Sequence, residues 1–282
     1  MLRALLCRDG VDRMRADAQA ATAGLSPASR WRATPLLLEG IAALLAGEAD
    51  RADRVLADAV ELGTDLKAWP AVSTALAERS VLAIGRDDWD QAELLTGQAL
   101  AVLQAEQLDD YIMSSLVYGM AAATALHRGD LAAARGHLAR AARLRPLLTH
   151  AIPTLAVQTL LELGRVYLAL ADLADARAVL RQATDILQLR PDLGTLPAQI
   201  DDLRSRLDTA RGAVAGASSL TTAELRLLPL LATHLTFREI GQRLYLSHNT
   251  VKTQAISIYR KVGANSRGQA VHLGQETGLL TT

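Results

Sequence analysis

The sequence predicts an all-α protein, and its composition gives two reasons for this fold class. Of the 282 residues, 50% are apolar, and alanine and leucine, which both favour helices, supply most of that fraction. Aromatic residues make up only 3%, and the β-branched and aromatic side chains that strands prefer are scarce. A chain of this length forms one large domain or two ordinary ones.

Residues 33–190 contain a helical repeat. The pattern is Ala-x3-Leu/Thr-x2-Ala, offset by 40, 42 and 42 residues, and its copies are Ala52/Leu56/Ala59, Ala92/Thr96/Ala99, Ala134/Leu138/Ala141 and Ala176/Leu180/Ala183. Residues at i, i+4 and i+7 lie on one face of a helix. Alanine on that face lets a neighbouring helix approach closely, and glycine-containing turns precede most copies. The pattern therefore predicts pairs of helices.

Each predicted pair would bury little apolar surface alone, so the pairs are expected to stack. This logic resembles that of tetratricopeptide repeats, although the period exceeds the usual one of about 34 residues. Such solenoids are usually binding surfaces. We expect this one to bind an effector or a protein, and a purely structural spacer is the alternative.

Small residues dominate the stretch from Gly212 to Ser219, and such a composition is typical of a flexible linker. The predicted domains are therefore a helical-repeat domain at 1–211, a linker at 212–219 and a C-terminal domain at 220–282.

Four helices are predicted in the C-terminal domain. The first opens at Thr221 or Thr222, with Glu224 in its first turn. Pro229 is discordant there, because proline inside a helix either kinks it or moves its start. The second helix opens at Thr236, and Glu239 three residues later completes a capping box.

Ser247 or Asn249 is expected to cap the third helix. Val251, Ala255, Ile258 and Val262 would form its buried face, and the opposite face would carry Asn249, Lys252, Thr253, Ile256 and Arg260. A helix, a tight turn and a second helix with an exposed lysine are typical of a helix-turn-helix DNA reader. Lysine can donate to guanine or phosphate, and methyl groups suit thymine.

The segment Leu220–Gly274 resembles the LuxR-type DNA-binding domain, because many of that family's positions follow in order without gaps. They include Thr236-Phe-Arg-Glu-Ile-Gly, Leu246-Ser-His-Asn-Thr-Val-Lys and Ile258-Tyr-Arg-Lys-Val-Gly. The resemblance implies a third helix that enters the major groove and a fourth that can dimerise. It also implies site residues: base-facing Lys252, Thr253 and Ile256; phosphate-facing Arg238, Ser247, Asn249, Thr250 and Arg260; and Ala270, Val271 and Leu273 for dimerisation.

Repeats followed by such a domain also resemble the MalT-like (LAL-type) regulators, which carry an ATP-binding domain before the repeats. This sequence has no G-x4-G-K-S/T motif. It is either the C-terminal part of a larger regulator or a short protein with these two domains, and the sequence leaves both open.

The neutral net charge hides an asymmetry. From Leu220 onward there are seven Lys/Arg and three Asp/Glu, which leaves 30 − 7 = 23 basic and 30 − 3 = 27 acidic residues before it. A basic module on a slightly acidic body suits a DNA-binding appendage.

No pattern supports an enzyme, a cofactor or a metal site. The six histidines lack metal-ligand spacing, and no G-x-S-x-G motif occurs. Cys7 is the single cysteine, no signal peptide is visible and no apolar run is long enough for a membrane span, so a cytoplasmic location is predicted.

The function predicted is sequence-specific regulation of transcription by a homodimer on double-stranded operator DNA that recruits RNA polymerase, and the family resemblance favours activation over repression. The alternative is an adaptor that does not bind DNA, in which the repeats hold a protein and the C-terminal helices only dimerise.

Overall fold

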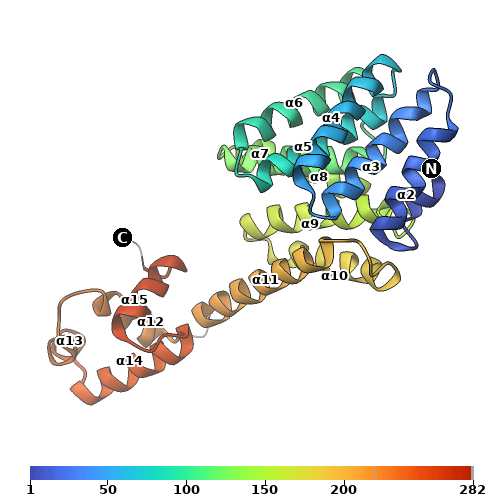
Figure 1. Ribbon diagram of the computed structural model, residues 1–282. Coiled ribbons are helices and arrows are strands. Elements are labelled where there is room, and N and C mark those ends of the chain that lie inside the picture. The colour runs from blue at the N-terminus through green and yellow to red at the C-terminus, as the bar shows by residue number, and fades with distance from the viewer. Residues whose placement is uncertain (219, 281–282) are drawn as a thin grey trace. The chain divides into compact units, whose positions relative to one another are not determined.

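A computed structural model describes residues 1–218 and 220–280, and all regular elements in these ranges are helices (Figure 1). The all-α prediction is therefore confirmed. The chain divides into two compact units, Met1–Arg204 and Ser205–Thr282. None of the helices in the described ranges combines the length and the apolar character needed to cross a lipid bilayer.

The N-terminal unit is built from helix pairs that stack on one another (Figure 1). The pairs are α3/α4, α5/α6, α7/α8 and α9/α10. The elements in chain order are α1 (Leu2–Leu6), α2 (Gly10–Gly24), the 3-10 helix η1 (Arg30–Arg32), α3 (Ala33–Leu45), α4 (Ala49–Asp65), α5 (Trp69–Gly85), α6 (Trp89–Ala105), α7 (Ser114–His127), α8 (Leu131–Leu144), η2 (Arg145–Leu147), α9 (Pro153–Ala169) and α10 (Leu173–Leu189), followed by α11 (Leu196–Ser218), which begins in this unit and ends in the second.

The repeat pattern marks the second helix of each pair. Every residue of the four Ala-x3-Leu/Thr-x2-Ala copies is buried, and all eight alanines are fully buried. The predicted buried face is thus confirmed. Close packing within a pair also needs glycine: a Cβ on Gly40 of α3 would lie 2.6 Å from the side chain of Leu56 on α4.

The turns inside the pairs share one backbone conformation. Gly47, Asp87, Gly129 and Ala171 all have positive φ, at 79, 59, 79 and 59°, and they follow one another at the 40, 42 and 42-residue offsets of the repeat pattern. Only glycine adopts this conformation without strain. The residue that follows each turn begins the next helix, and in three of the four pairs it is an aspartate whose carboxylate caps that helix.

The first helices of the pairs form a consecutive inner layer, in which α3 contacts α5, α5 contacts α7 and α7 contacts α9. The chain after α10 returns to the start of this layer, where the Thr195 N–H donates to the Leu45 carbonyl at 2.9 Å. Helix α1 contacts both α3 and α9, and the Arg190 side chain donates to the Leu6 carbonyl. The first and last parts of the repeat region are therefore joined.

Residues 212–218, which belong to the predicted linker, are helical. They continue α11, which ends at Ser218, and residue 219 lies outside the described residues. Three alanines in this stretch favour helix and offset the cost of its two glycines.

The C-terminal unit contains α12 (Thr222–Leu231), α13 (Phe237–Leu244), α14 (His248–Val262) and α15 (Arg267–Glu276). Helix α14 packs against each of the other three. Their shared core consists of Leu220, Leu227, Leu228, Leu231, Ile240, Val251, Ala255, Ile258 and Leu280. The core holds α14 by one face and leaves its other face free.

Candidate nucleic-acid interface

Capping boxes begin two of the helices that support α14; the sequence predicts the one at Thr236, and the one at Thr221 is an addition. The Thr221 N–H donates to Glu224 Oε2 at 2.6 Å, and the Glu224 N–H donates to Thr221 Oγ1 at 3.3 Å. Thr236 and Glu239 make the same reciprocal bonds at 2.7 and 3.3 Å. Each box satisfies two backbone groups that a helix start leaves without partners.

Pro229 lies inside α12 without moving its start, which remains at Thr222. The residue is exposed and the helix ends two residues later, at Leu231. The hydrogen bond that proline cannot make therefore falls in an exposed final turn, where water can replace it.

The turn between α13 and α14 depends on close backbone packing. Tyr245 ends α13 in the left-handed conformation, with φ at 57°. The Leu246 N–H then donates to the Gly241 carbonyl at 2.8 Å. A Cβ on Gly241 would lie 2.7 Å from the Leu246 carbonyl oxygen, so glycine is required for this tight turn.

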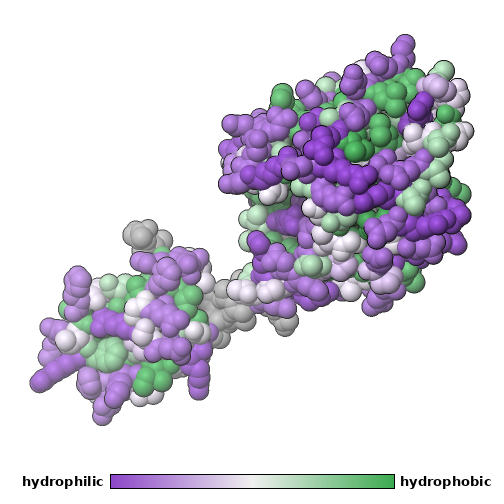
Figure 2. Space-filling model, in the orientation of Figure 1, coloured by the Kyte–Doolittle hydropathy of each residue, from purple (hydrophilic) through white to green (hydrophobic). Residues whose placement is uncertain are grey.

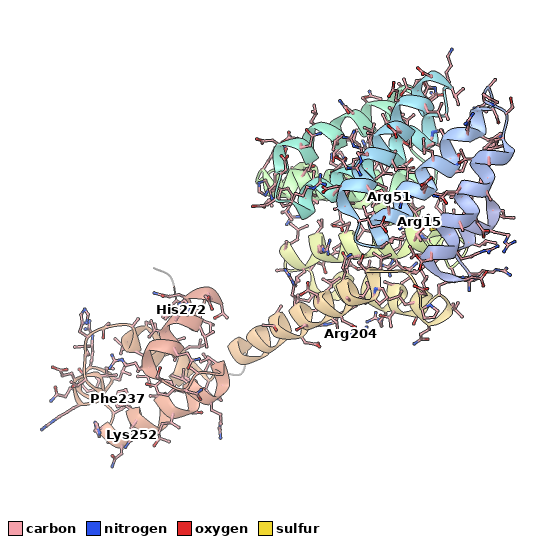
Figure 3. All side chains as sticks on the ribbon, in the orientation of Figure 1. Arg15, Arg51, Arg204, Phe237, Lys252 and His272 are labelled. Atoms are coloured by element: carbon pink, nitrogen blue, oxygen red, sulfur yellow. The ribbon has the colours of Figure 1, made fainter. Side chains whose placement is uncertain are left out.

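Helix α14 has one buried and one exposed face. Val251, Ala255 and Ile258 are fully buried, and Val262 packs partly against the same core. Lys252 and Thr253 are exposed, and Ile256 is 56% exposed. The structure thus places the three predicted base-facing residues together on the outer face, and Figure 3 shows Lys252 pointing away from the rest of the unit.

The predicted phosphate-facing residues lie near both ends of α14. Ser247 Oγ accepts the Thr250 N–H at 3.1 Å and shares a 2.8 Å hydrogen bond with Thr250 Oγ1, so both hydroxyls belong to the cap. Asn249 is exposed beside them, and Arg238 is exposed in the first turn of α13. Arg260 is exposed eight residues after Lys252, about 12 Å along the axis.

An ion pair fixes the far end of α14. Lys261 Nζ lies 2.7 Å from Glu224 Oε2. Burial raises the pKa of Glu224, but hydrogen bonds from Lys261, from Thr221 and from the Ser257 hydroxyl outweigh this effect and lower the pKa to about 2. Glu224 therefore joins α12 to α14 as well as capping α12.

Arg267 is a positioning residue that the sequence reasoning did not single out. Its guanidinium donates to the carbonyls of Leu231, Leu235 and Thr233 at 2.9, 2.8 and 2.7 Å. It also lies 5.9 Å from the centre of the Phe237 ring. It fixes the loop between α12 and α13, and only its place in the family resemblance could have indicated this role.

The predicted dimerisation residues on α15 differ in how far their own unit buries them. Ala270 is fully buried in its own unit, and Val271 packs partly against the unit's core. Ala270 faces inward because it is one helical turn from Gly274, which packs against Leu228 and Leu280. Leu273 is half-buried, and His272 is exposed on the same helix (Figure 3).

The basic residues of this unit fall into two groups. Lys261 and Arg267 hold helices and loops together, as described above. The others are exposed and form no ion pair within residues 220–280: Arg226, Arg238, Arg243, Lys252 and Arg260. Figure 2 shows hydrophilic side chains over much of the visible face of this unit. In the described part of the chain, no three His, Cys, Asp or Glu residues are grouped as a metal site would require.

Comparison with known proteins identifies the class of this module. Residues 218–273 match the family model described as bacterial regulatory proteins, luxR family. The C-terminal unit therefore carries a LuxR-type helix-turn-helix domain, a class of domain that binds DNA.

The chain is also similar to the transcriptional regulatory protein YdfI of Bacillus subtilis (strain 168). The two are 41% identical over 64 residues, which is 23% of this chain and 30% of that relative. The chain thus matches less than a third of the relative's length.

Proposed function

We propose that this protein is a sequence-specific DNA-binding regulator of transcription. The proposal depends mainly on the amphipathic character of α14. Its inner side is fully buried, while Lys252, Thr253 and Ile256 are exposed together on its outer side. An α-helix fits the major groove, where each base pair presents a distinct pattern of donors, acceptors and methyl groups.

The chemistry of this face suits base edges. The Lys252 ammonium can donate to guanine O6 and N7, while the methyl groups of Thr253 and Ile256 can contact thymine. Ile256 adds an exposed apolar side chain to this face, and a thymine methyl group is a suitable contact for it. Ile256 would then favour A·T pairs at its position in the operator.

Phosphate binding would come from both ends of the helix. Asn249 and the capped N-terminus of α14 offer donors at one end, with Arg238 nearby on α13, and Arg260 offers a guanidinium at the other. The hydroxyls of Ser247 and Thr250 hold the cap and can still accept or donate outward. Contacts to phosphate position a protein on the duplex without reading its sequence.

The remaining parts of the proposal extend to the whole chain. The stacked helix pairs would be tetratricopeptide-like repeats that receive a signal or a partner, as in MalT-like regulators. The protein would act in the cytoplasm as a homodimer on DNA and recruit RNA polymerase, as an activator. On α15, Val271 and Leu273 are better placed for dimerisation than Ala270, because their own unit leaves both of them partly open.

Lys252→Ala tests the proposal. If Lys252 reads a base, the variant should lose about 1–3 kcal/mol of affinity for a DNA site selected by the wild type, and less for unrelated DNA. The dissociation constants would be measured by fluorescence anisotropy at two salt concentrations. A uniform loss on all sequences with a shallower salt dependence would make Lys252 a phosphate contact instead.

Lys67→Ala is the matched control, since Lys67 is an exposed lysine of the repeat unit. It should bind the selected site as the wild type does. If neither wild type nor control binds DNA at low salt, the adaptor hypothesis replaces this one.

A further inference from the structure

The repeat unit contains an apolar cavity of about 290 Å³ at the end of the inner layer where α5 begins. It is lined from segments far apart in the sequence: α1, η1, α3, the start of α5, the chain between α6 and α7, and the residue before α9. Its apolar walls include Leu5, Leu37, Pro70, Ala71, Met113 and Ile152. Its volume is near the lower end of the range of small-molecule sites.

Two aromatic side chains line this cavity and remain exposed. Trp31 is 59% exposed and Tyr111 is 44% exposed, although the chain has only three tryptophans and five tyrosines. Rings of this size normally bury much of their surface. Their exposure beside an apolar cavity leaves flat apolar surface available to a ligand.

The charge at the cavity is positive. Arg30 is the one charged side chain among the lining residues, and no carboxylate lines the cavity. Arg30 is exposed, and its guanidinium has no ion pair or hydrogen bond with any residue in the described part of the chain. Some arginines of the unit have their charge taken up by a carboxylate, as Arg51 does with Glu39 and Arg79 with Asp53.

We propose that this cavity binds a small aromatic monocarboxylate. The ring would occupy the apolar interior against Trp31 and Tyr111, and the carboxylate would lie at the mouth near the Arg30 guanidinium. Most of the affinity would come from burying the ring, because an exposed ion pair contributes little. The inference rests on the proposed role of the repeats as the signal-binding part.

The position of the cavity suits a regulatory ligand. Its walls come from α1, from the first helices of two helix pairs, from the chain between α6 and α7, and from the residue before α9. A ligand there would touch both the first helix of the unit and the start of α9, which α1 also contacts. Binding would therefore stabilise the joined ends of the repeat region and raise its melting temperature.

The test is direct titration of the full chain with 1-naphthaleneacetate and indole-3-acetate, each compared with its neutral amide. Binding would be followed by calorimetry, without DNA. Saturable binding is expected, with each acid about 2- to 5-fold tighter than its amide, the range for an exposed ion pair. Absence of saturable binding by either acid up to millimolar concentration, or equal binding of acid and amide, would overturn the proposal.

Two variants locate the site. Arg30→Gln should bind the acid no more tightly than the amide. Thr34→Phe should place a ring in the cavity and lower the affinity for both the acid and the amide. Arg54→Gln, on the exposed face of α4, is the matched control and should change neither. A thermal melt checks that Thr34→Phe is folded. If that variant is unfolded, Arg30→Gln, whose position is exposed, still decides whether the cavity is the binding site.

These readouts are independent of the DNA-binding proposal. Acid binding that survives both Arg30→Gln and Thr34→Phe would contradict the cavity as the site. Loss of DNA binding in Lys252→Ala has no effect on the titration, so failure of either proposal can be recognised separately.

Discussion

Replacing Glu78 by glutamine should stabilise the repeat unit, increasingly as pH rises. Glu78 of α5 is fully buried, and the Gln158 side chain of α9 donates from its Nε2 to Glu78 Oε2 at 2.6 Å. Glu78 Oε1 and Gln158 Oε1 are both buried acceptors without a donor. A proton on Glu78 Oε1 would supply one.

The pKa of Glu78 carries this argument. Burial raises it to about 8, the hydrogen bond from Gln158 opposes that rise, and the nearby Glu162 carboxylate adds to it. In the unfolded chain the usual value is 4.5. Because the folded value is the higher one, the folded state keeps a proton that the unfolded state has lost, and stability declines from about pH 4.5 until about pH 8.

Between these two pKa values, the free energy of unfolding decreases by about 1.36 kcal/mol for each pH unit. At pH 7 the free energy of unfolding of the wild type should be about 3 kcal/mol lower than below pH 4.5, and at pH 8 the decrease should be somewhat larger. Glutamine is neutral and nearly isosteric, so Glu78→Gln should recover most of this. Its advantage should be under about 1 kcal/mol at pH 5.

The assay is guanidinium unfolding followed by tryptophan fluorescence. All three tryptophans, Trp31, Trp69 and Trp89, lie in the repeat unit, so the signal reports on that unit. Glu61→Gln, at an exposed position on α4, should change stability by less than about 0.5 kcal/mol at any pH. A Glu78→Gln effect that is destabilising, or that does not change with pH, would refute the reasoning.

Three further substitutions follow from the structure. Lys261→Met removes the partner of buried Glu224 and should lower the free energy of unfolding of the C-terminal unit by about 1–3 kcal/mol. Since the pKa of Glu224 is lowered, the stabilisation by this ion pair is present above about pH 4.5 and is lost toward pH 2. Hydrogen exchange in residues 220–280 measures the loss. Gly241→Ala should cost about 1–3 kcal/mol by overpacking the turn and weaken DNA binding, and normal binding would contradict it. Ala171→Gly should stabilise the repeat unit by about 0.5–1 kcal/mol, because alanine is strained at φ 59°, and an unchanged denaturation midpoint would exclude that strain.

The sequence predicts features that depend on local spacing. The buried alanine faces of the repeats, the capping box at Thr236 and the outer face of α14 follow from helical periodicity and from the side chains that can cap a helix. These rules involve residues within two turns of one another, so no knowledge of the tertiary fold is needed.

Features that depend on distant residues could not be predicted. Ala270 is buried because α15 packs against residues of α12 and the C-terminal segment, and periodicity alone does not say which face meets them. The pairing of Glu78 with Gln158 joins positions 80 residues apart. The cavity beside Arg30 arises only because separate helix pairs and α1 meet there. The left-handed conformation of Ala171 is imposed by the repeat register and contradicts the residue's own preference.

The most direct test of the central claim is selection from a random double-stranded DNA library by the full chain at two salt concentrations, with sequencing of the bound fraction. The account predicts an enriched motif that persists at the higher salt and is lost or altered in Lys252→Ala. Binding that disappears with salt and enriches no motif, or a motif unchanged by Lys252→Ala, would contradict sequence readout by α14.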